Sequence, residues 1–220
     1  MHKDDAEQSG DLTLRRSRGR PRAFDRTAAL DAATTLFWTN GYEATSISDL
    51  TEAMGIGAKS LYAAFGSKDA LFTEALHHYV RKYGGLAWDR AREAPTAREA
   101  ASAFLYDSAA ALSGSVCDMP RGCMATIASL GCEGLAAVGE FAASIETTFQ
   151  RLEARLKKGV DDGDLPPSVD VAQLARFVET VQSGMSVKAR NGADRAELEG
   201  VAKVAMAGWD GIVRAANAEG

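Results

Sequence analysis

Apolar residues recur along most of this chain at the three- to four-residue spacing that places them on one face of an α-helix. The first such segment begins after Asp25, which can cap a helix, and ends at Asn40-Gly41, where a left-handed backbone is tolerated. Longer helices are predicted over residues 68–84, 97–113, 121–133, 137–160, 170–190 and 194–217. No segment alternates convincingly like a β-strand, so the sequence predicts an all-α protein of about nine helices.

A short helix is predicted between residues 46 and 55, ahead of a glycine turn. Ser46 can accept a hydrogen bond from an early amide, and Asp49 can reach back as a shorter stand-in for glutamate. Gly55 ends this helix. Two short helices separated by a glycine-containing turn match a helix-turn-helix. A small helical bundle without a role in DNA binding is the alternative interpretation.

The second short helix, Ala58–Phe65, is expected to have one buried and one exposed side. At about 100° per residue, Ala58, Leu61 and Phe65 share the side that would face the interior. The side chains expected on the opposite side or at its edge are Lys59, Ser60, Tyr62 and Ala63. These are modest in size or polarity, and a major groove about 12 Å wide admits a helix with such a surface.

The stretch GYEATSISDLTEAMGIGAKSLYAAFGSKDALF, residues 41–72, resembles the DNA-binding segment of the TetR family of one-component transcriptional regulators. The matching features are Gly41-Tyr42, Thr45-Ser46, the Leu50 to Gly55 helix, Leu61-Tyr62, Phe65, Ser67-Lys68 and Ala70-Leu71-Phe72. The rest of the chain matches only in helical character and length, as the family's variable ligand-binding domain would. Gly57 and Ala63-Ala64 depart from the common pattern, which leaves fewer direct base contacts.

The expected DNA contacts fall into two groups. The residues expected to read base edges are Lys59 toward guanine, Ser60 as a hydrogen-bonding group and Ala63 against a thymine methyl. The residues expected to contact phosphates are Thr45, Ser46, Tyr62 and Lys68. The family resemblance implies the same role for Thr45, Tyr62 and Lys68.

The charge distribution supports a DNA-binding N-terminal region. The whole chain has a net charge of −5, but residues 15–68 contain more Arg and Lys than Asp and Glu. Residues 1–23 read as a disordered arm whose RRSRGRPR motif can lie along the minor groove or the phosphates, with Arg20 and Arg22 favoured. A solvated tail without contacts is the alternative. The expected domains are the arm 1–23, a helix-turn-helix domain 24–68 and an effector-binding and dimerisation domain 69–220.

Dimerisation is expected through the last two helices, since one short helix reads too few bases for selectivity. Their apolar stripes are Val171, Leu174, Phe177, Val178, Val181 and Met185, and Leu198, Val201, Ala205, Gly208, Trp209 and Ile212. The alternative is that both stripes face the chain's own core. Family resemblance favours a four-helix interface between two copies.

The middle helices are expected to enclose a cavity for a small apolar or aromatic effector. The candidate lining residues are Trp88, Phe104, Met119, Cys123, Met124, Ile127, Phe141 and Phe177. Ordinary core packing is the alternative for each. Cys117, Cys123 and Cys132 could instead sense copper or an oxidant, although free cysteines are usually small buried apolar residues.

The sequence therefore predicts a ligand-responsive repressor that binds a palindromic operator as a homodimer and is released by a small apolar effector. No catalytic motif, cofactor or metal site is expected, and neither a secretion signal nor a membrane span is found, so a cytoplasmic location is expected. One alternative is a helical ligand-binding or scaffolding protein with weak or lost DNA binding. The other is a cysteine-based metal- or redox-responsive regulator.

Overall fold

The structure is a computed structural model that describes residues 24–116, 119–131, 135–144 and 147–219. Within these ranges the chain forms eleven α-helices and no β-strand, so the prediction of an all-α fold is confirmed. The helices are α1 (Arg26–Asn40), α2 (Ile47–Met54), α3 (Ala58–Phe65), α4 (Lys68–Tyr83), α5 (Gly85–Glu93), α6 (Ala97–Leu112), α7 (Met124–Gly131), α8 (Ala136–Ser144), α9 (Thr148–Asp161), α10 (Val171–Arg190) and α11 (Arg195–Glu219).

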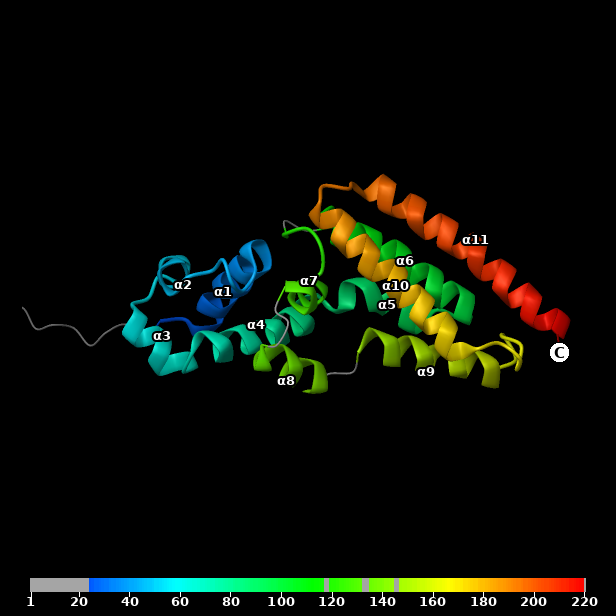
Figure 1. The fold of residues 1–220 in the computed structure, drawn as a ribbon, viewed down its shortest axis with the longest axis horizontal. Coiled ribbons are helices and arrows are strands. Elements are labelled where there is room, and N and C mark those ends of the chain that lie inside the picture. Colours follow the sequence, from blue (N-terminus) through cyan, green and yellow to red (C-terminus); the bar gives the residue numbers. More distant parts are fainter. Residues whose placement is uncertain (1–23, 117–118, 132–134, 145–146, 220) are drawn as a thin grey trace, which may run out of the picture.

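The first three helices form a compact group at one end of an elongated molecule (Figure 1). The helix α4 begins in this group and runs toward the middle of the molecule, where α5, α7 and α8 contact it. The helices α6, α9, α10 and α11 form the other end, with α11 along its outer edge. The helix α4 is therefore the continuous element that joins the two ends.

Two apolar cores hold these parts together. The first joins α1–α4 with α7 and α8, and its fully buried side chains include Phe37, Leu61 and Phe72. The second joins α6, α9, α10 and α11 around residues such as Phe104 and Trp209. The first core therefore continues beyond residue 68, where the sequence analysis ended the helix-turn-helix domain.

The first two helices begin where predicted because local hydrogen bonds cap them. Asp25 Oδ1 accepts from the amides of Thr27 and Ala28 at 2.9 and 3.1 Å at the start of α1. At the start of α2, the Ser46 amide donates to Asp49 Oδ2 at 2.8 Å and the Asp49 amide donates to Ser46 Oγ at 3.1 Å. The predicted capping box is therefore confirmed.

The described residues form two more helices than expected, because α5 was not predicted and one predicted helix is divided. The backbone of Gly84 stays helical, with φ −60° and ψ −30°, and α5 begins directly after it. The helix expected over 137–160 is two helices, α8 and α9. The second of these begins after Thr147, whose hydroxyl accepts from the Gln150 amide while the Gln150 side chain accepts from the Thr147 amide. This capping box was visible in the sequence as a Thr followed three residues later by Gln.

Candidate nucleic-acid interface

The turn between α2 and α3 holds the second helix against the first core. Gly55 adopts a left-handed backbone, with φ 64°, and the Ile56 amide donates to the Thr51 carbonyl at 3.1 Å. Leu61 is 0% exposed and Phe65 is 6% exposed, so one side of α3 is locked in the core. This orientation was predicted from spacing alone and is confirmed.

The opposite side of α3 is open to solvent. Its exposed residues are Lys59, Ser60, Tyr62 and Ala63, and the Tyr62 side chain is 48% exposed. Ala58, which was expected on the buried side, is exposed as well. Its neighbours are exposed too, since the whole first turn of α3, residues 57–60, projects beyond the core. The end of the molecule that carries α3 thus presents a small, mildly polar helix surface.

Lys68 lies at the start of α4, beside the α3 surface. Its Nζ sits 4.1 Å from the centre of the Tyr42 ring, and the Tyr42 hydroxyl donates to Asp69 Oδ1. Within the described part of the chain Lys68 forms no ion pair, so its charge is not neutralised there by a carboxylate. Arg26 differs, because Glu74 accepts from its guanidinium at 2.5 and 2.7 Å and raises the pKa of Arg26. Lys68 is therefore the better placed of the two for an anion.

Thr45 and Ser46, two residues expected to contact phosphates, already make hydrogen bonds within the turn before α2 and the start of that helix. Thr45 is 0% exposed, and its hydroxyl donates to the Gly41 carbonyl at 2.6 Å, so its side chain cannot reach a phosphate without rearrangement. Ser46 is exposed, but its amide is taken by Asp49. Hydrogen bonds from Ser46 lower the pKa of Asp49, which keeps a negative charge at the start of α2. Thr45 is thus a positioning residue for the turn, and only the Ser46 hydroxyl remains for donation outward.

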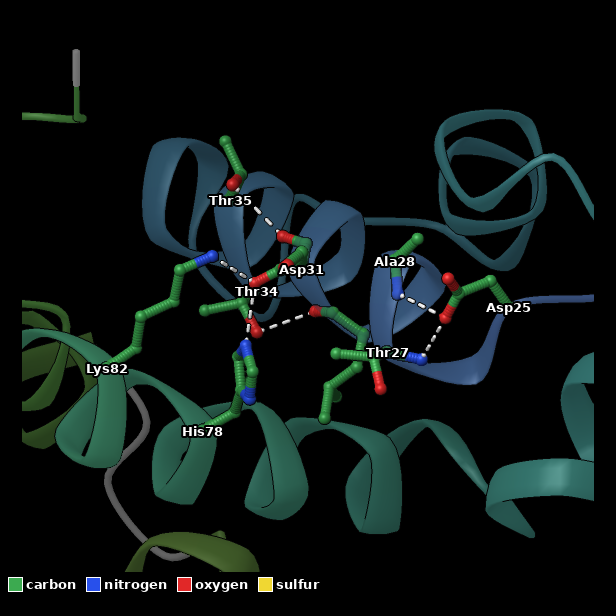
Figure 2. Close-up of polar contacts among 9 residues, drawn as sticks. Asp25, Thr27, Ala28, Asp31, Thr34, Thr35, His78 and Lys82 are labelled. Carbon is green, nitrogen blue, oxygen red and sulfur yellow. Dashed lines mark hydrogen bonds and ion pairs between the residues drawn. The ribbon is translucent and has the colours of Figure 1, made fainter.

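The first three helices are joined to the C-terminal half of α4 by a polar cluster between α1 and α4. Figure 2 shows Asp31 of α1 reaching His78 and Lys82 of α4, with 2.6 Å from Asp31 Oδ1 to His78 Nε2 and 2.6 Å to Lys82 Nζ. The hydrogen bond from Lys82 is the main cause that lowers the pKa of Asp31, and burial partly opposes it. These contacts join α1 to the C-terminal half of α4.

The C-terminal end of α1 is also tied to the larger part of the molecule. Arg190, the last residue of α10, donates to the carbonyl of Trp38 at 2.5 Å and to that of Thr39. The Trp38 indole donates to the Gly122 carbonyl at 3.0 Å. The adjacent Cys123 amide donates to Ser186 Oγ of α10 at 2.8 Å. The segment around Gly122 therefore lies between α1 and α10 and contacts both.

A cavity of about 130 Å³ lies among α4, α5, α6, α9 and α10, next to Cys123. Of the eight candidate lining residues, Trp88, Phe104 and Cys123 line it. The other five do not line this cavity. Met124 and Ile127 border a second hollow of about 260 Å³ beside α1.

The three remaining candidates lie away from both hollows. Phe141 packs in the first core with its ring 5.1 Å from that of His77. Met119 packs against the same core, and Phe177 borders a surface hollow beside Ile212. The polar lining residues that sequence reasoning missed are Tyr79, Ser108, Thr148, Arg151 and Gln182. For Ser108 and Gln182 the only available signal was a polar residue on an otherwise apolar helix face.

The outer face of α10 and α11 differs from the predicted stripes. Half of the twelve predicted stripe residues are buried in the chain's own core: Leu174, Val178, Met185, Leu198, Ala205 and Trp209. The large exposed apolar residues on these two helices are Val187, Val201, Val204 and Ile212, with Val204 73% exposed. The reason is that α11 packs against α6 and α10, so the longer side chains on the facing sides are buried between these helices. These three valines and one isoleucine are not covered by the described part of the chain.

Some expectations lie outside the described residues. Arg20 and Arg22 of the basic arm, and Cys117 and Cys132, are among them. Cys123 is half-buried with a free thiol. Within the described ranges no three His, Cys, Asp or Glu side chains gather as a metal site, and no helix there is both long and apolar enough to cross a membrane.

Comparison with known proteins places this arrangement among bacterial regulators. Residues 29–75 match the family model described as bacterial regulatory proteins, tetR family. The chain is 34% identical over 208 residues to the HTH-type transcriptional repressor ComR of Escherichia coli K12, covering 91% of this chain and 96% of ComR. It is 46% identical over 71 residues to the repressor BdcR of the same strain, covering 31% of this chain and 36% of BdcR.

A similar fold has been solved on DNA. The chain is 40% identical to a cysteine mutant of the TetR family regulator CifR in complex with a 26-base-pair operator, with a TM-score of 0.78. The similarity covers 86% of this chain and 98% of that one.

Proposed function

This chain belongs to the TetR family of bacterial regulatory proteins, and we propose that it represses transcription by binding a palindromic operator as a homodimer. It is a ligand-responsive, DNA-binding transcriptional regulator, as its relatives of known activity are regulators rather than enzymes. We propose no catalytic role and a cytoplasmic place of action, where the operator is found. The observation that carries the proposal is the orientation of α3, which buries Leu61 and Phe65 and leaves its opposite side open.

The open side of α3 supports entry into the major groove. Lys59 would reach a guanine edge, Ser60 would hydrogen-bond a base, and Ala63 would contact a thymine methyl. None of these side chains is long enough, apart from Lys59, to hold the helix away from the groove floor. Sequence selectivity in this proposal depends chiefly on Lys59.

Phosphate contacts would fix the helix in the groove. Lys68 supplies a charge that no described carboxylate pairs with, and Tyr62 supplies a half-exposed hydroxyl at the edge of α3. The Ser46 hydroxyl remains a weaker candidate because the carboxylate of Asp49 lies beside it. The arm residues Arg20 and Arg22 would add contacts in the adjacent minor groove.

Two copies would pair through the outer face of α10 and α11. This face carries Val187, Val201, Val204 and Ile212, and a Cβ added at Gly208 would meet nothing within 4 Å. Its small and branched residues would allow helices of a partner to approach closely. Pairing would place two α3 helices in successive major grooves, about 34–36 Å apart.

Effector binding would act through the contacts that α1 makes with the rest of the chain. A ligand that binds one arrangement of α4 and the Gly122 segment better than another shifts the population toward it. Asp31 joins α1 to α4, and Trp38 joins α1 to the Gly122 segment. A shift of α4 or of the Gly122 segment would therefore change the spacing of the two α3 helices. Release from DNA requires only that the preferred arrangement have the wrong spacing.

The test is a fluorescence anisotropy titration of the full chain with a palindromic fragment from its own promoter and with a scrambled fragment. Tighter binding to the palindrome is expected. Lys59→Ala should reduce that preference, whereas Lys157→Ala, an exposed α9 residue paired with Glu153, should leave it intact. Equal binding to both fragments by the wild type would instead favour a helical ligand-binding protein without operator recognition.

A further inference from the structure

We propose that the cavity among α4, α5, α6, α9 and α10 selects a small uncharged ligand that consists of one ring and one hydrogen-bonding group. Phenol is the simplest molecule of this class. The inference rests on the proposed function, because it names the chemical class of the effector. It is carried by two polar side chains of the cavity wall, Ser108 and Gln182, that have no hydrogen-bond partner among the described residues, and the Ser108 hydroxyl is fully buried.

The size of the cavity limits the ligand to about one ring. Its volume is about 130 Å³, and a cavity of roughly 150 Å³ is known to accept benzene. The walls are largely aromatic and aliphatic, since the rings of Trp88 and Phe104 lie 4.5 Å apart and Leu86 and Leu112 complete the surface. A long acyl chain or a fused polycyclic ligand would require these walls to separate.

Two polar groups in these walls lack a hydrogen-bond partner in the part of the chain that the structure describes. Ser108 is 1% exposed, and its hydroxyl oxygen has no partner within the described residues. Gln182 is 9% exposed, and its side-chain amide makes no hydrogen bond to the described part of the chain. Both residues line the cavity, Ser108 from α6 and Gln182 from α10. Buried polar groups are costly when unpaired, so a ligand that hydrogen-bonds them gains more than a purely apolar one.

The surroundings favour an uncharged ligand. No carboxylate of the described residues lines the cavity, so a cation would be buried without a counter-ion. The one guanidinium in the lining, that of Arg151, lies over the Trp88 ring at 5.8 Å from its centre and has a further interaction within the protein, so it is not left unpaired for an anion. Burial, and secondarily the Cys123 thiol, raises the pKa of Tyr79 well above its usual value, so this hydroxyl stays protonated. Ser108, Gln182 and Tyr79 together offer neutral donors and acceptors.

The cavity also contacts the segment that holds α1. Cys123 lines the cavity and directly follows Gly122, whose carbonyl accepts from the Trp38 indole. A ring placed beside Cys123 would press on this segment and thereby on the end of α1. A ligand in this cavity would therefore lie next to the segment through which it would act on α1.

The experiment measures binding of phenol, toluene and benzoate to the full-length chain by isothermal titration calorimetry, with operator binding measured separately. Phenol should bind about tenfold more tightly than toluene, as expected for one well-formed buried hydrogen bond, and benzoate should bind more weakly than phenol. Ser108→Ala and Gln182→Leu should each reduce the preference for phenol over toluene while toluene binding persists. The control Ser113→Ala, whose hydroxyl donates to the Ala110 carbonyl outside the cavity lining, should keep the preference.

Three results would overturn the inference: toluene binding as tightly as phenol, benzoate binding more tightly than phenol, or an unchanged preference in both cavity variants. Absence of binding by all three compounds would also refute the ligand class. If the same preparation still prefers the operator, the proposed function stands without it. Failure of operator binding alone would count against the proposed function and not against the ligand class.

Discussion

Replacing Lys68 by glutamine should change how strongly operator binding depends on salt. Lys68 opens α4 beside the exposed side of α3, and its Nζ lies 4.1 Å from the centre of the Tyr42 ring. Because no described carboxylate pairs with it, its positive charge is available to a phosphate. Glutamine keeps a polar side chain that is one bond shorter and removes the charge, so the variant tests chiefly the electrostatic contact.

The expected magnitude follows from the number of phosphates that are neutralised. Each phosphate contacted by a lysine adds about 0.9 to the slope of log K against log salt, so one contact per copy in a dimer adds about 1.8. Between 50 and 200 mM salt, a slope difference of about 1.8 corresponds to roughly a twelvefold difference in lost affinity. The wild type should therefore weaken about twelvefold more than Lys68→Gln over this range.

The assay is fluorescence anisotropy with a labelled palindromic operator at four salt concentrations. Lys157→Gln on α9 serves as the control, since it removes one positive charge far from α3 and should leave the slope unchanged. A slope for Lys68→Gln equal to that of the wild type would show that this lysine contacts no phosphate. An equal change in the control would show that net charge, and not the contact, sets the slope.

Three further changes test the core, the cavity and the α1–α4 cluster. Leu61→Ala should lower the free energy of unfolding, measured by urea denaturation, by about 2–5 kcal/mol, because this leucine is fully buried. Operator binding should weaken as well. A loss of stability below about 1 kcal/mol would contradict the packing described for Leu61. Ser108→Ala should raise the free energy of unfolding of the unliganded chain by about 1 kcal/mol, because it removes an unpaired buried hydroxyl; lower stability would show that the hydroxyl is paired. Asp31→Asn should be less stable than the wild type at neutral pH. The fold lowers the pKa of Asp31 from its ordinary value of 3.8, so the stability that Asp31 contributes is present above about pH 4 and is lost as the pH falls through the lowered pKa. The difference in melting temperature between the wild type and Asp31→Asn should therefore be smaller at pH 3 than at pH 7. An equal difference at both pH values would refute the ion pair.

Much of the helix-turn-helix could be read from the sequence because its determinants are local. The capping residues Asp25 and Ser46 act on amides two or three residues away, and the spacing of Leu61 and Phe65 defines one side of a single helix. Such interactions need no knowledge of the rest of the fold. The same holds for Thr147, whose capping box was present in the sequence but was not used.

The candidate effector residues could be predicted only in part, for a different reason. Apolar spacing identifies a face that must be covered, but it does not say whether a cavity, a neighbouring helix or a second copy covers it. Phe104 and Phe141 have the same character in the sequence, yet one lines the cavity and the other fills the first core. The stripe of α10 shows the same limit, since Leu174 and Met185 turned out to belong to the chain's own core.

The sequence by itself determined the helical class, the short helix pair and the side of α3 that stays open, because three- and four-residue spacing and helix caps specify these. Only the tertiary structure decided that Thr45 is buried, that Arg190 reaches the end of α1, and that Ser108 and Gln182 line the same cavity. Arg190 and Trp38, like Ser108 and Gln182, lie far apart in the chain. Their proximity depends on how whole helices pack, which is a property of all the buried side chains together and of no single segment.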